Sequence, residues 1–493
     1  MLQLSLQAAR FYLRLAPKPE PAAWEEAVNS LPPRSTVVRL ATLEGLRFYA
    51  LDPASYTIAA WQWLSEQTAG ASAWVVGLRS MGSVLAPVVA AALADRGCSI
   101  RLLTLRPVGA PEQRQIRLEP VMQQQFARWP GTFLIVDEGP GLSGSSFGGT
   151  VAALRRLGIP QARIVLLPSW SPTPEALGNA YAAQHWERWR AYPAPALPAP
   201  GPDAVDLSGG LWRQRMGIHR SVPVWPTHER RKLLCGRGRI LVKFGGLGRY
   251  GCATQVRAQE LARAGWGPEL AGGDLDPCWV SYRRMRAAAV TQPGMAWCRF
   301  AGRYLAWVAS TYRIGVSAAP SVELQEMLTA NLGKPVDAPE GPVVALDGRM
   351  LACEWGETAQ GFVKFDGTDH GDDPFFPGPA DIAWDLAAVD VEFGPTRGRA
   401  VIETYRRVSG ETLRALVPRL RWHRLAYLAF RMAYCRLAAT QTPAPDSARF
   451  ARLAEGYTRL TFCPGRSRWS LGSPRVIDSD RSSGKPLPAD RTG

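Results

Sequence analysis

Apolar runs of four to seven residues alternate with helix-like periodicity in the first part of the chain. A short apolar run bounded by turn residues predicts a buried strand, and apolar residues that recur every three or four positions predict a helix. Strands that alternate with helices indicate an α/β domain with a mainly parallel sheet, expected over residues 1–190. Strands are predicted at 73–77, 100–105, 133–136 and 164–167, and helices at 84–93 and 150–157.

A proline-rich segment ends this alternation. Five prolines fall within residues 191–202, which is typical of a semi-rigid linker, expected over residues 191–225. Strands come first and helices later in the α+β domain expected over residues 226–463. Residues 464–493 are rich in Ser, Arg, Pro and Gly and predict a disordered tail. The strands of the second domain are predicted near residues 240–244, 343 and 362, and its helices at about 254–264 and 399–438.

Composition agrees with a folded protein of several domains. The chain has 493 residues, 46% of them hydrophobic, which is enough for two or three buried cores. Its net charge of +16 comes from six lysines and 52 arginines, beside many Ala, Pro and Gly. A compositional bias toward Arg produces such a charge without a polyanionic partner, so nucleic acid is not an expected partner.

Neither a membrane segment nor a cysteine-based site is predicted. The longest apolar run, residues 85–94, is about half of the roughly 20 residues that a spanning helix needs. Arg10 and Arg14 interrupt the N-terminal apolar run, which therefore does not resemble a secretory signal. The eight cysteines include no C-x-x-C pair and do not cluster with histidines, which argues against a zinc site or a disulfide framework. We expect a cytoplasmic protein.

The most informative segment is residues 132–147, TFLIVDEGPGLSGSSF. Its apolar run predicts a buried strand, and Asp137 and Glu138 follow at the carboxyl end, where open α/β sheets bind ligands. A loop of Gly and Ser then leads into a helix that Gly158 ends. Small residues let backbone N–H groups approach a phosphate, and a helix N-terminus favours negative charge. Because carboxylates suit sugar hydroxyls or a divalent metal ion, the segment predicts a site for a phosphorylated sugar with Mg²⁺.

This segment resembles the signature of the type I phosphoribosyltransferases: an apolar strand, two acidic residues and a Thr/Ser/Gly loop for the 5-phosphate of phosphoribosyl pyrophosphate. Residues 74–83, WVVGLRSMGS, are similar to the short pyrophosphate loop of that family, and residues 104–117 lie where the family has a mobile basic loop. The resemblance covers about residues 70–170. It departs from the family in its Asp-Glu pair and in a phosphate loop one residue longer. The alternative is an ordinary strand–turn–helix with a tight Gly/Ser turn.

The resemblance implies roles for individual residues. Asp137 and Glu138 would hold the ribose hydroxyls, and Arg106 or Arg114 of the basic loop would stabilise the leaving pyrophosphate. Mg²⁺ and basic residues stabilise the charge that develops when the anomeric carbon is displaced. A hood of variable sequence, within residues 3–56 or 169–190, would select the acceptor. The implied substrate-binding residues are Arg79, Ser80, Met81 and Gly82 of the pyrophosphate loop, and Gly141, Ser143, Gly144, Ser145 and Ser146 of the phosphate loop.

The second predicted domain carries residues in an order typical of kinases. Lys243 ends a strand of sequence ILVKF, and Glu260 lies on the helix that follows. A strand lysine that faces a helix glutamate orients the phosphates of ATP in kinases. Three acidic positions follow further along the chain: Asp347, Asp366 and Asp385.

These segments resemble the C-terminal lobe of the aminoglycoside phosphotransferase and choline kinase group. The resemblance implies that ATP binds, that Asp366 binds Mg²⁺ and that Asp385 braces the catalytic loop. The general base stays open, because Asp347 has the family's spacing to Asp366 but lacks its His-Gly-Asp context and its metal-binding Asn. His370-Gly-Asp372 has that context but follows the metal-binding strand.

Simpler interpretations of the second half also remain. Acidic residues among Gly and Pro are common in solvated loops, and Asp381 or Asp385 would then cap a helix. A Ca²⁺ loop is not indicated, because the spacing does not follow the EF-hand pattern. The arginine-rich stretch 416–438 has interleaved aromatic residues that suit nucleic acid, but its apolar periodicity favours a packed helix.

The sequence therefore predicts a glycosyltransferase that moves a phosphoribosyl group from phosphoribosyl pyrophosphate to an acceptor it does not identify. A kinase-like domain that uses ATP on a small molecule is fused to it. The alternative is a non-catalytic protein that senses phosphoribosyl pyrophosphate or a nucleotide. Small phosphorylated metabolites are the expected partners and Mg²⁺ the expected cofactor, and a homodimer is compatible with the sequence.

Overall fold

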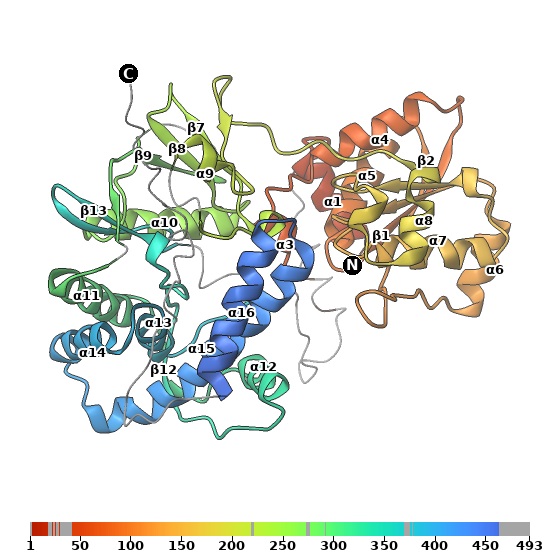
Figure 1. Cartoon of the computed structure of the whole chain (residues 1–493). Coiled ribbons are helices and arrows are strands. Elements are labelled where there is room, and N and C mark those ends of the chain that lie inside the picture. Colours follow the sequence, from red (N-terminus) through yellow and green to blue (C-terminus); the bar gives the residue numbers. More distant parts are fainter. Residues whose placement is uncertain are drawn as a thin grey trace, which may run out of the picture. The chain divides into compact units, whose positions relative to one another are not determined.

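A computed structural model describes most of the chain, and its residues fall into two units (Figure 1). Unit 1 comprises Met1–Ala204, Lys243–Ala253 and Asp274–Val280, and unit 2 comprises Val205–Val242, Thr254–Gly273 and Ser281–Gly493. The predicted disordered tail lies outside the described residues. The described residues are 2–17, 22, 25, 29, 42–217, 221–272, 277–290, 292–368, 375–376 and 378–462.

Unit 1 is built on a parallel sheet in the strand order β2-β1-β3-β4-β5. All four predicted strands are present, and the predicted mainly parallel sheet is confirmed. Successive side chains on a strand point to opposite faces, so Val75 and Leu134 enter one core while Trp74 and Phe133 enter another. The strands are β1 (Ser72–Leu78), β2 (Ser99–Leu105), β3 (Thr132–Val136), β4 (Ile164–Leu167) and β5 (Arg190–Ala191).

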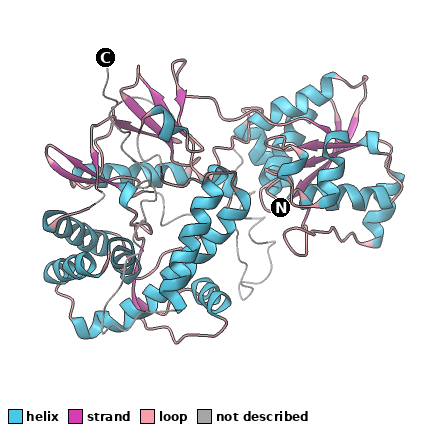
Figure 2. Ribbon diagram, viewed as in Figure 1, coloured by secondary structure: helices cyan, strands magenta, loops and turns pink. Residues whose placement is uncertain are grey.

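Helices cover both faces of this sheet (Figure 2). Tyr56 and Leu85 bring α4 and α5 into one core, and Phe126 and Phe147 bring α6 and α7 into the other. Helix α7 begins at Ser145 rather than at residue 150, so Ser145 and Ser146 of the predicted phosphate loop lie in its first turn. The helices are α1 (Leu2–Tyr12), α3 (Glu44–Arg47), α4 (Ser55–Ser65), α5 (Gly82–Asp95), α6 (Pro120–Arg128), α7 (Ser145–Arg156) and α8 (Ala180–His185).

Three smaller sheets follow along the chain, with antiparallel pairs in each. Within the predicted linker, 191–225, the structure has strand β6 and the short helix α9 (Leu211–Arg215). One sheet has the order β6-β7-β8-β9: β6 (Val205–Asp206), β7 (Lys232–Cys235), β8 (Ile240–Phe244), β9 (Trp279–Arg283). A second sheet has the order β10-β13-β14: β10 (Ala288–Ala289), β13 (Trp355–Thr358), β14 (Gly361–Lys364). The third pairs β11 (Arg313–Ala318) with β12 (Gly341–Val344).

A helical core dominates unit 2. Trp297, Trp355, Trp384 and Tyr427 are fully buried in it. As the predicted order requires, α13 to α16 follow the last described strand, β14, whereas α10, α11 and α12 alternate with strands. Residues 416–438 lie in α15 with their aromatic side chains in or against this core, so the packed-helix interpretation is confirmed. The helices are α10 (Arg249–Arg263), α11 (Met295–Thr311), α12 (Val322–Leu332), α13 (Ala383–Phe393), α14 (Pro395–Ser409), α15 (Leu413–Gln441) and α16 (Asp446–Phe462).

Among the described residues, no helix is both long enough and apolar enough to cross a membrane.

Candidate functional site

The three predicted loops of unit 1 meet at one edge of its sheet. The pyrophosphate loop (residues 79–82) follows β1, the basic loop (residues 104–117) begins at the end of β2, and the acidic pair and phosphate loop (residues 137–146) follow β3. Strand β1 lies between β2 and β3, and all three are parallel, so their carboxyl ends share an edge. The chain passes from β1 to β2 on one side of β1 and then to β3 on the other side. Such a reversal of strand order is the switch point where open α/β sheets bind ligands.

Direct contacts join the three loops. Arg79 donates from its backbone N–H to Leu105 O at 2.8 Å and from Nε to Thr104 Oγ1 at 2.9 Å. A Cβ atom on Gly82 would lie 2.6 Å from the carbonyl oxygen of Val136, so only glycine lets α5 begin this close to β3. The pyrophosphate loop therefore lies against both neighbouring motifs.

The phosphate loop holds the basic loop through one carbonyl group. The hydroxyls of Ser143 and Ser145 donate to Pro111 O at 2.8 and 2.5 Å, and their oxygens lie 2.9 Å apart. Gly141 and Gly144 have positive φ angles of 64° and 69°, which glycine adopts without strain. The turn places Ser145 at the start of α7, where the unpaired N–H groups of a helix attract anions.

The acidic pair is half-buried beside these loops. Burial raises the pKa of Asp137 to about 7, against backbone hydrogen bonds and the charge of Arg114, which lower it. Burial likewise raises the pKa of Glu138 to about 8, with further contributions from Asp137 and Glu44. Because removal from water disfavours their charged forms, both carboxyls are poised to change ionisation when a cation or a hydroxyl-rich ligand enters.

Three contacts to the acidic pair were not predicted individually. Tyr56 donates its hydroxyl to Asp137 O at 2.8 Å, and the backbone N–H of Gly45 donates to Glu138 Oε2 at 3.0 Å. Ser169 donates its hydroxyl to Glu138 O. Gly45 and Tyr56 come from one of the two alternative hood segments, 3–56, and Ser169 comes from the other, 169–190, so both segments reach the acidic pair.

The other predicted residues of unit 1 differ in exposure. Arg79, Ser80 and Arg106 are exposed, whereas Arg114 and Ser146 are half-buried. Met81 is 3% exposed and packs in the core beneath the sheet edge, so only its backbone faces the predicted ligand. The substrate-binding and catalytic roles of all these residues stay predictions.

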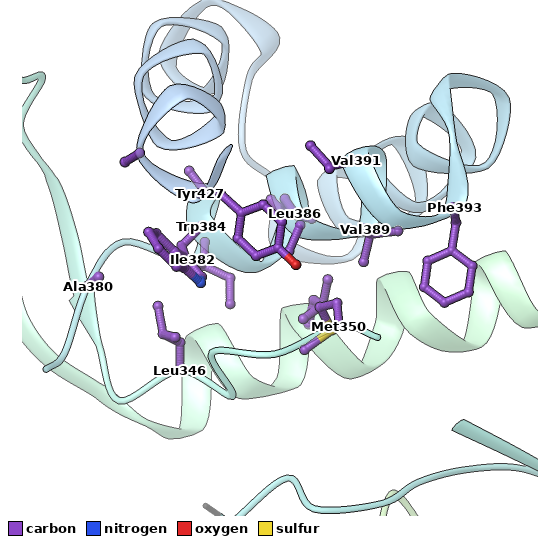
Figure 3. Packing of buried hydrophobic residues seen from close by; sticks show 14 of the residues in the cluster. Leu346, Met350, Ala380, Ile382, Trp384, Leu386, Val389, Val391, Phe393 and Tyr427 are labelled. Carbon is purple, nitrogen blue, oxygen red and sulfur yellow. The ribbon is translucent and has the colours of Figure 1, made fainter. Parts of the chain in front are cut away.

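In unit 2, Asp385 braces the loop that carries Asp347. The carboxylate of Asp385, on the first turn of α13, accepts the backbone N–H groups of Asp347 at 3.1 Å and Gly348 at 3.0 Å. Leu346 and Met350 flank this turn and pack against α13 (Figure 3). The brace that the kinase resemblance implied is therefore present.

Asp347 itself is fully buried among polar partners. Its Oδ2 accepts the hydroxyl of Tyr304 at 2.6 Å and lies 3.2 Å from Lys364 Nζ. Its Oδ1 is buried and has no hydrogen-bond partner among the described residues. One oxygen is thus fixed, and the other is left to accept a proton or a hydroxyl group.

Lys364 joins Asp347 to a second carboxylate. Its Nζ lies 3.2 Å from Glu354 Oε2 and donates to Phe365 O at 2.7 Å. Burial lowers the pKa of Lys364, but the charges of Asp347, Glu354 and Asp366 outweigh this and hold it above its ordinary value. Burial raises the pKa of Glu354 to about 7, against the neighbouring cations.

Arg257 ties the Asp347 loop to the loop of Asp366. From helix α10, its Nη1 and Nη2 donate to Ala345 O at 2.8 Å and Leu346 O at 3.1 Å. Its Nε donates to Gly367 O at 2.9 Å, one residue after Asp366. This side chain was not predicted, because backbone carbonyls leave no signature in the sequence.

The remaining kinase-like residues stay predictions. Lys243 is buried on β8 in unit 1, and Glu260 is half-buried on α10 in unit 2, so their pairing stays a prediction. His370-Gly-Asp372, the alternative base motif, lies outside the described residues. Within the described ranges, no three His, Cys, Asp or Glu side chains gather in a way that suits a metal ion.

Comparisons with known proteins find likenesses among solved structures. No protein-family model matches the chain, and no curated protein matches it. It is similar to a choline/ethanolamine kinase family protein from Mesorhizobium loti, with 18% identity, 48% of this chain and 86% of that chain covered, and a TM-score of 0.34. It is also similar to the choline kinase of Streptococcus pneumoniae, with 15% identity, 46% of this chain and 89% of that chain covered, and a TM-score of 0.31. A third likeness is to a macrolide 2′-phosphotransferase from Brachybacterium faecium, with 14% identity, 49% of this chain and 90% of that chain covered, and a TM-score of 0.30.

These likenesses are to kinases and phosphotransferases and extend over about half of the chain. Their TM-scores are low, and none of the three proteins is named as a phosphoribosyltransferase. The functions proposed below therefore rest on the geometry of the two sites.

Proposed function

We propose that unit 1 binds phosphoribosyl pyrophosphate with Mg²⁺ and transfers its phosphoribosyl group to an acceptor. One observation carries the proposal: the three loops that the resemblance named separately contact one another at the switch point of a parallel sheet. A tight Gly/Ser turn accounts for the phosphate loop alone. It does not account for two other loops with basic residues converging on it.

Each loop would bind a different part of the substrate. The N–H groups at the start of α7, with Ser143 and Ser145, would bind the 5-phosphate, and the pyrophosphate loop would bind the pyrophosphate. Asp137 and Glu138 would accept hydrogen bonds from the ribose hydroxyls. Mg²⁺ commonly binds through substrate phosphates and few protein carboxylates, and here it would stabilise charge on the pyrophosphate.

Transfer breaks the bond between the anomeric carbon and the pyrophosphate oxygen and forms a bond to the acceptor nucleophile. Arg106 and Arg114 of the basic loop would stabilise the departing pyrophosphate. Since Pro111 O occupies the hydroxyls of Ser143 and Ser145, the basic loop must release them before a phosphate binds. Loop movement is therefore part of the proposed cycle.

Pyrophosphate release tests this function. The full-length protein is incubated with phosphoribosyl pyrophosphate, Mg²⁺ and a panel of nucleobases and amines, and pyrophosphate is measured. The proposal expects acceptor-dependent release in the wild type and its loss in Asp137→Asn. Tight binding without release for any acceptor would favour the alternative, a sensor, and absence of binding would contradict both.

A second candidate function belongs to unit 2: transfer of a phosphoryl group from ATP to a small molecule. The observation that favours it is Asp347, braced by Asp385 and held at Oδ2, with Oδ1 left to accept the proton of an acceptor hydroxyl. Asp366 would hold Mg²⁺ together with the nucleotide phosphates.

ATP-dependent labelling of a metabolite extract tests the second function. We expect labelling by the wild type and its loss in Asp347→Asn. Lys232→Ala, which removes a half-buried lysine of unit 2 paired with Glu229 at 2.8 Å, is a control outside the proposed site and should keep the activity. Labelling that survives Asp347→Asn would contradict the assignment.

A further inference from the structure

Lys364 is a strand lysine that has no access to water. It ends β14, is 1% exposed, and its Nζ lies over the ring of Trp355, 5.6 Å from the ring centroid. An ammonium group has three N–H donors. Three acceptors surround it: Asp347 Oδ2, Glu354 Oε2 and Phe365 O.

The carboxylate oxygens that face Lys364 have no room for a second cation. Glu354 is held on both sides, since Arg349 Nε lies 3.2 Å from Oε1 and Lys364 Nζ lies 3.2 Å from Oε2. Asp347 Oδ2 is shared between Lys364 and Tyr304. A divalent ion between Asp347 and Glu354 would need these same oxygens and would lie against a buried ammonium group.

The kinase resemblance implies a metal ion held by Asp366, two residues after Lys364. The residues present do not fit a metal ion between Asp347 and Glu354, because the ammonium group of Lys364 already fills that position. No three metal-ligating side chains gather anywhere in the part of the chain that the structure describes. Removing Lys364 alone would leave buried carboxylates without their shared counter-charge, which is costly.

We propose that Lys364 is the resident cation of this acidic cluster and occupies the position that a divalent metal ion would take between Asp347 and Glu354. It keeps the two carboxylates close together without a metal. Lys364 is a positioning residue, because it holds Asp347 Oδ2 in place. The inference concerns the charged groups at the second proposed site and rests on that proposal for its location. Its test measures metal binding and not phosphoryl transfer. Its failure is therefore distinguishable from failure of phosphoryl transfer.

Mn²⁺ titration of the full-length protein, followed by the paramagnetic signal of the free ion without nucleotide, tests the inference. Lys364→Ala removes the ammonium and leaves space among the carboxylates. It should bind one more Mn²⁺ per chain than the wild type, and the double variants with Asp347→Asn or Glu354→Gln should lose that ion. Mn²⁺ should also raise the melting temperature of Lys364→Ala more than that of the wild type. Lys232→Ala, the matched lysine with one carboxylate partner, should gain no ion.

If Lys364→Ala does not fold, single variants that keep Lys364 provide an independent test. Asp347→Asn and Glu354→Gln should leave the Mn²⁺ stoichiometry of the wild type unchanged. Loss of a bound ion in both variants would overturn the inference, because it would place a metal between these residues beside Lys364. A folded Lys364→Ala that gains no Mn²⁺ would overturn it as well.

Discussion

The hydroxyl of Ser143 donates a hydrogen bond of 2.8 Å to the carbonyl oxygen of Pro111. This contact joins a loop predicted to bind a phosphate to a loop predicted to carry basic residues over a pyrophosphate. Ser145 donates to the same oxygen, so one carbonyl group occupies two donors of the proposed phosphate site. If a phosphate binds there, as we propose, the basic loop must move to release these two hydroxyls.

Ser145→Ala should weaken the binding of phosphoribosyl pyrophosphate by about tenfold to a hundredfold. A hydrogen bond to a charged group contributes about 1.5–3 kcal/mol, and about 1.4 kcal/mol corresponds to a factor of ten. Calorimetric titration of the full-length protein measures the change. Ser65→Ala, in the same unit, removes an exposed hydroxyl that bonds only to Gln62 O and should leave the affinity unchanged. Equal effects in both variants would contradict a phosphate site at α7.

Gly82→Ala should disturb the junction of the pyrophosphate loop with β3. The added Cβ would lie 2.6 Å from the carbonyl oxygen of Val136, a backbone atom that cannot move without displacing the strand. We expect a destabilisation of about 1–3 kcal/mol, as for overpacking in a core, and weaker ligand binding. Gly178→Ala, whose Cβ would meet only atoms at 3.8 Å or more, is the control in a thermal melt. An unchanged melting temperature in Gly82→Ala would contradict the close approach.

The acidic pair should make stability depend on pH. In the folded protein, burial raises the pKa of Asp137 to about 7, whereas its ordinary value is 3.8. Between these values the folded state binds more protons than the unfolded state, so the stability from this residue decreases as pH rises from about 4 to about 7.

Asp137→Asn removes this contribution. Urea unfolding at several pH values should show the variant gaining stability relative to the wild type as pH rises through that window, with no further gain above it. A difference between the two proteins that does not vary with pH would contradict the raised pKa.

Arg257→Met should loosen both acidic loops of unit 2. The variant keeps most of the side-chain volume but leaves three carbonyl groups, on Ala345, Leu346 and Gly367, without their donor. An unsatisfied buried polar group costs about 1–3 kcal/mol, so we expect a lower melting temperature and reduced phosphoryl transfer. Arg263→Met, on an exposed position of the same helix, should change neither. Full activity in Arg257→Met would show that α10 does not position these loops.

Local patterns predicted much of unit 1. The apolar runs around Val75 and Leu134 are long enough for buried strands, and the parallel arrangement followed from the helices between them. The start of α7 was missed by five residues because Ser145, Ser146 and the glycines after them show no apolar periodicity. Contacts such as Gly45 to Glu138 join positions 93 residues apart and depend on tertiary packing alone.

Unit 2 was less accessible to prediction. The brace from Asp385 to Asp347 followed from a family resemblance, whereas Arg257 acts through backbone carbonyls, which any sequence provides. Lys364 did leave a signal. A lysine on an apolar strand, two residues before the predicted metal-binding Asp366, is out of place unless a buried carboxylate pairs with it.

The binding of phosphoribosyl pyrophosphate to the full-length protein tests the central claim most directly. The melting temperature is measured with Mg²⁺ alone and with Mg²⁺ plus phosphoribosyl pyrophosphate, for the wild type and Asp137→Asn. Ligand at a hundred times its Kd stabilises a folded protein by about 2.7 kcal/mol, so we predict a clear rise for the wild type and none for the variant. No rise in the wild type, or the same rise in both proteins, would contradict a phosphoribosyl pyrophosphate site at the edge of β1 and β3.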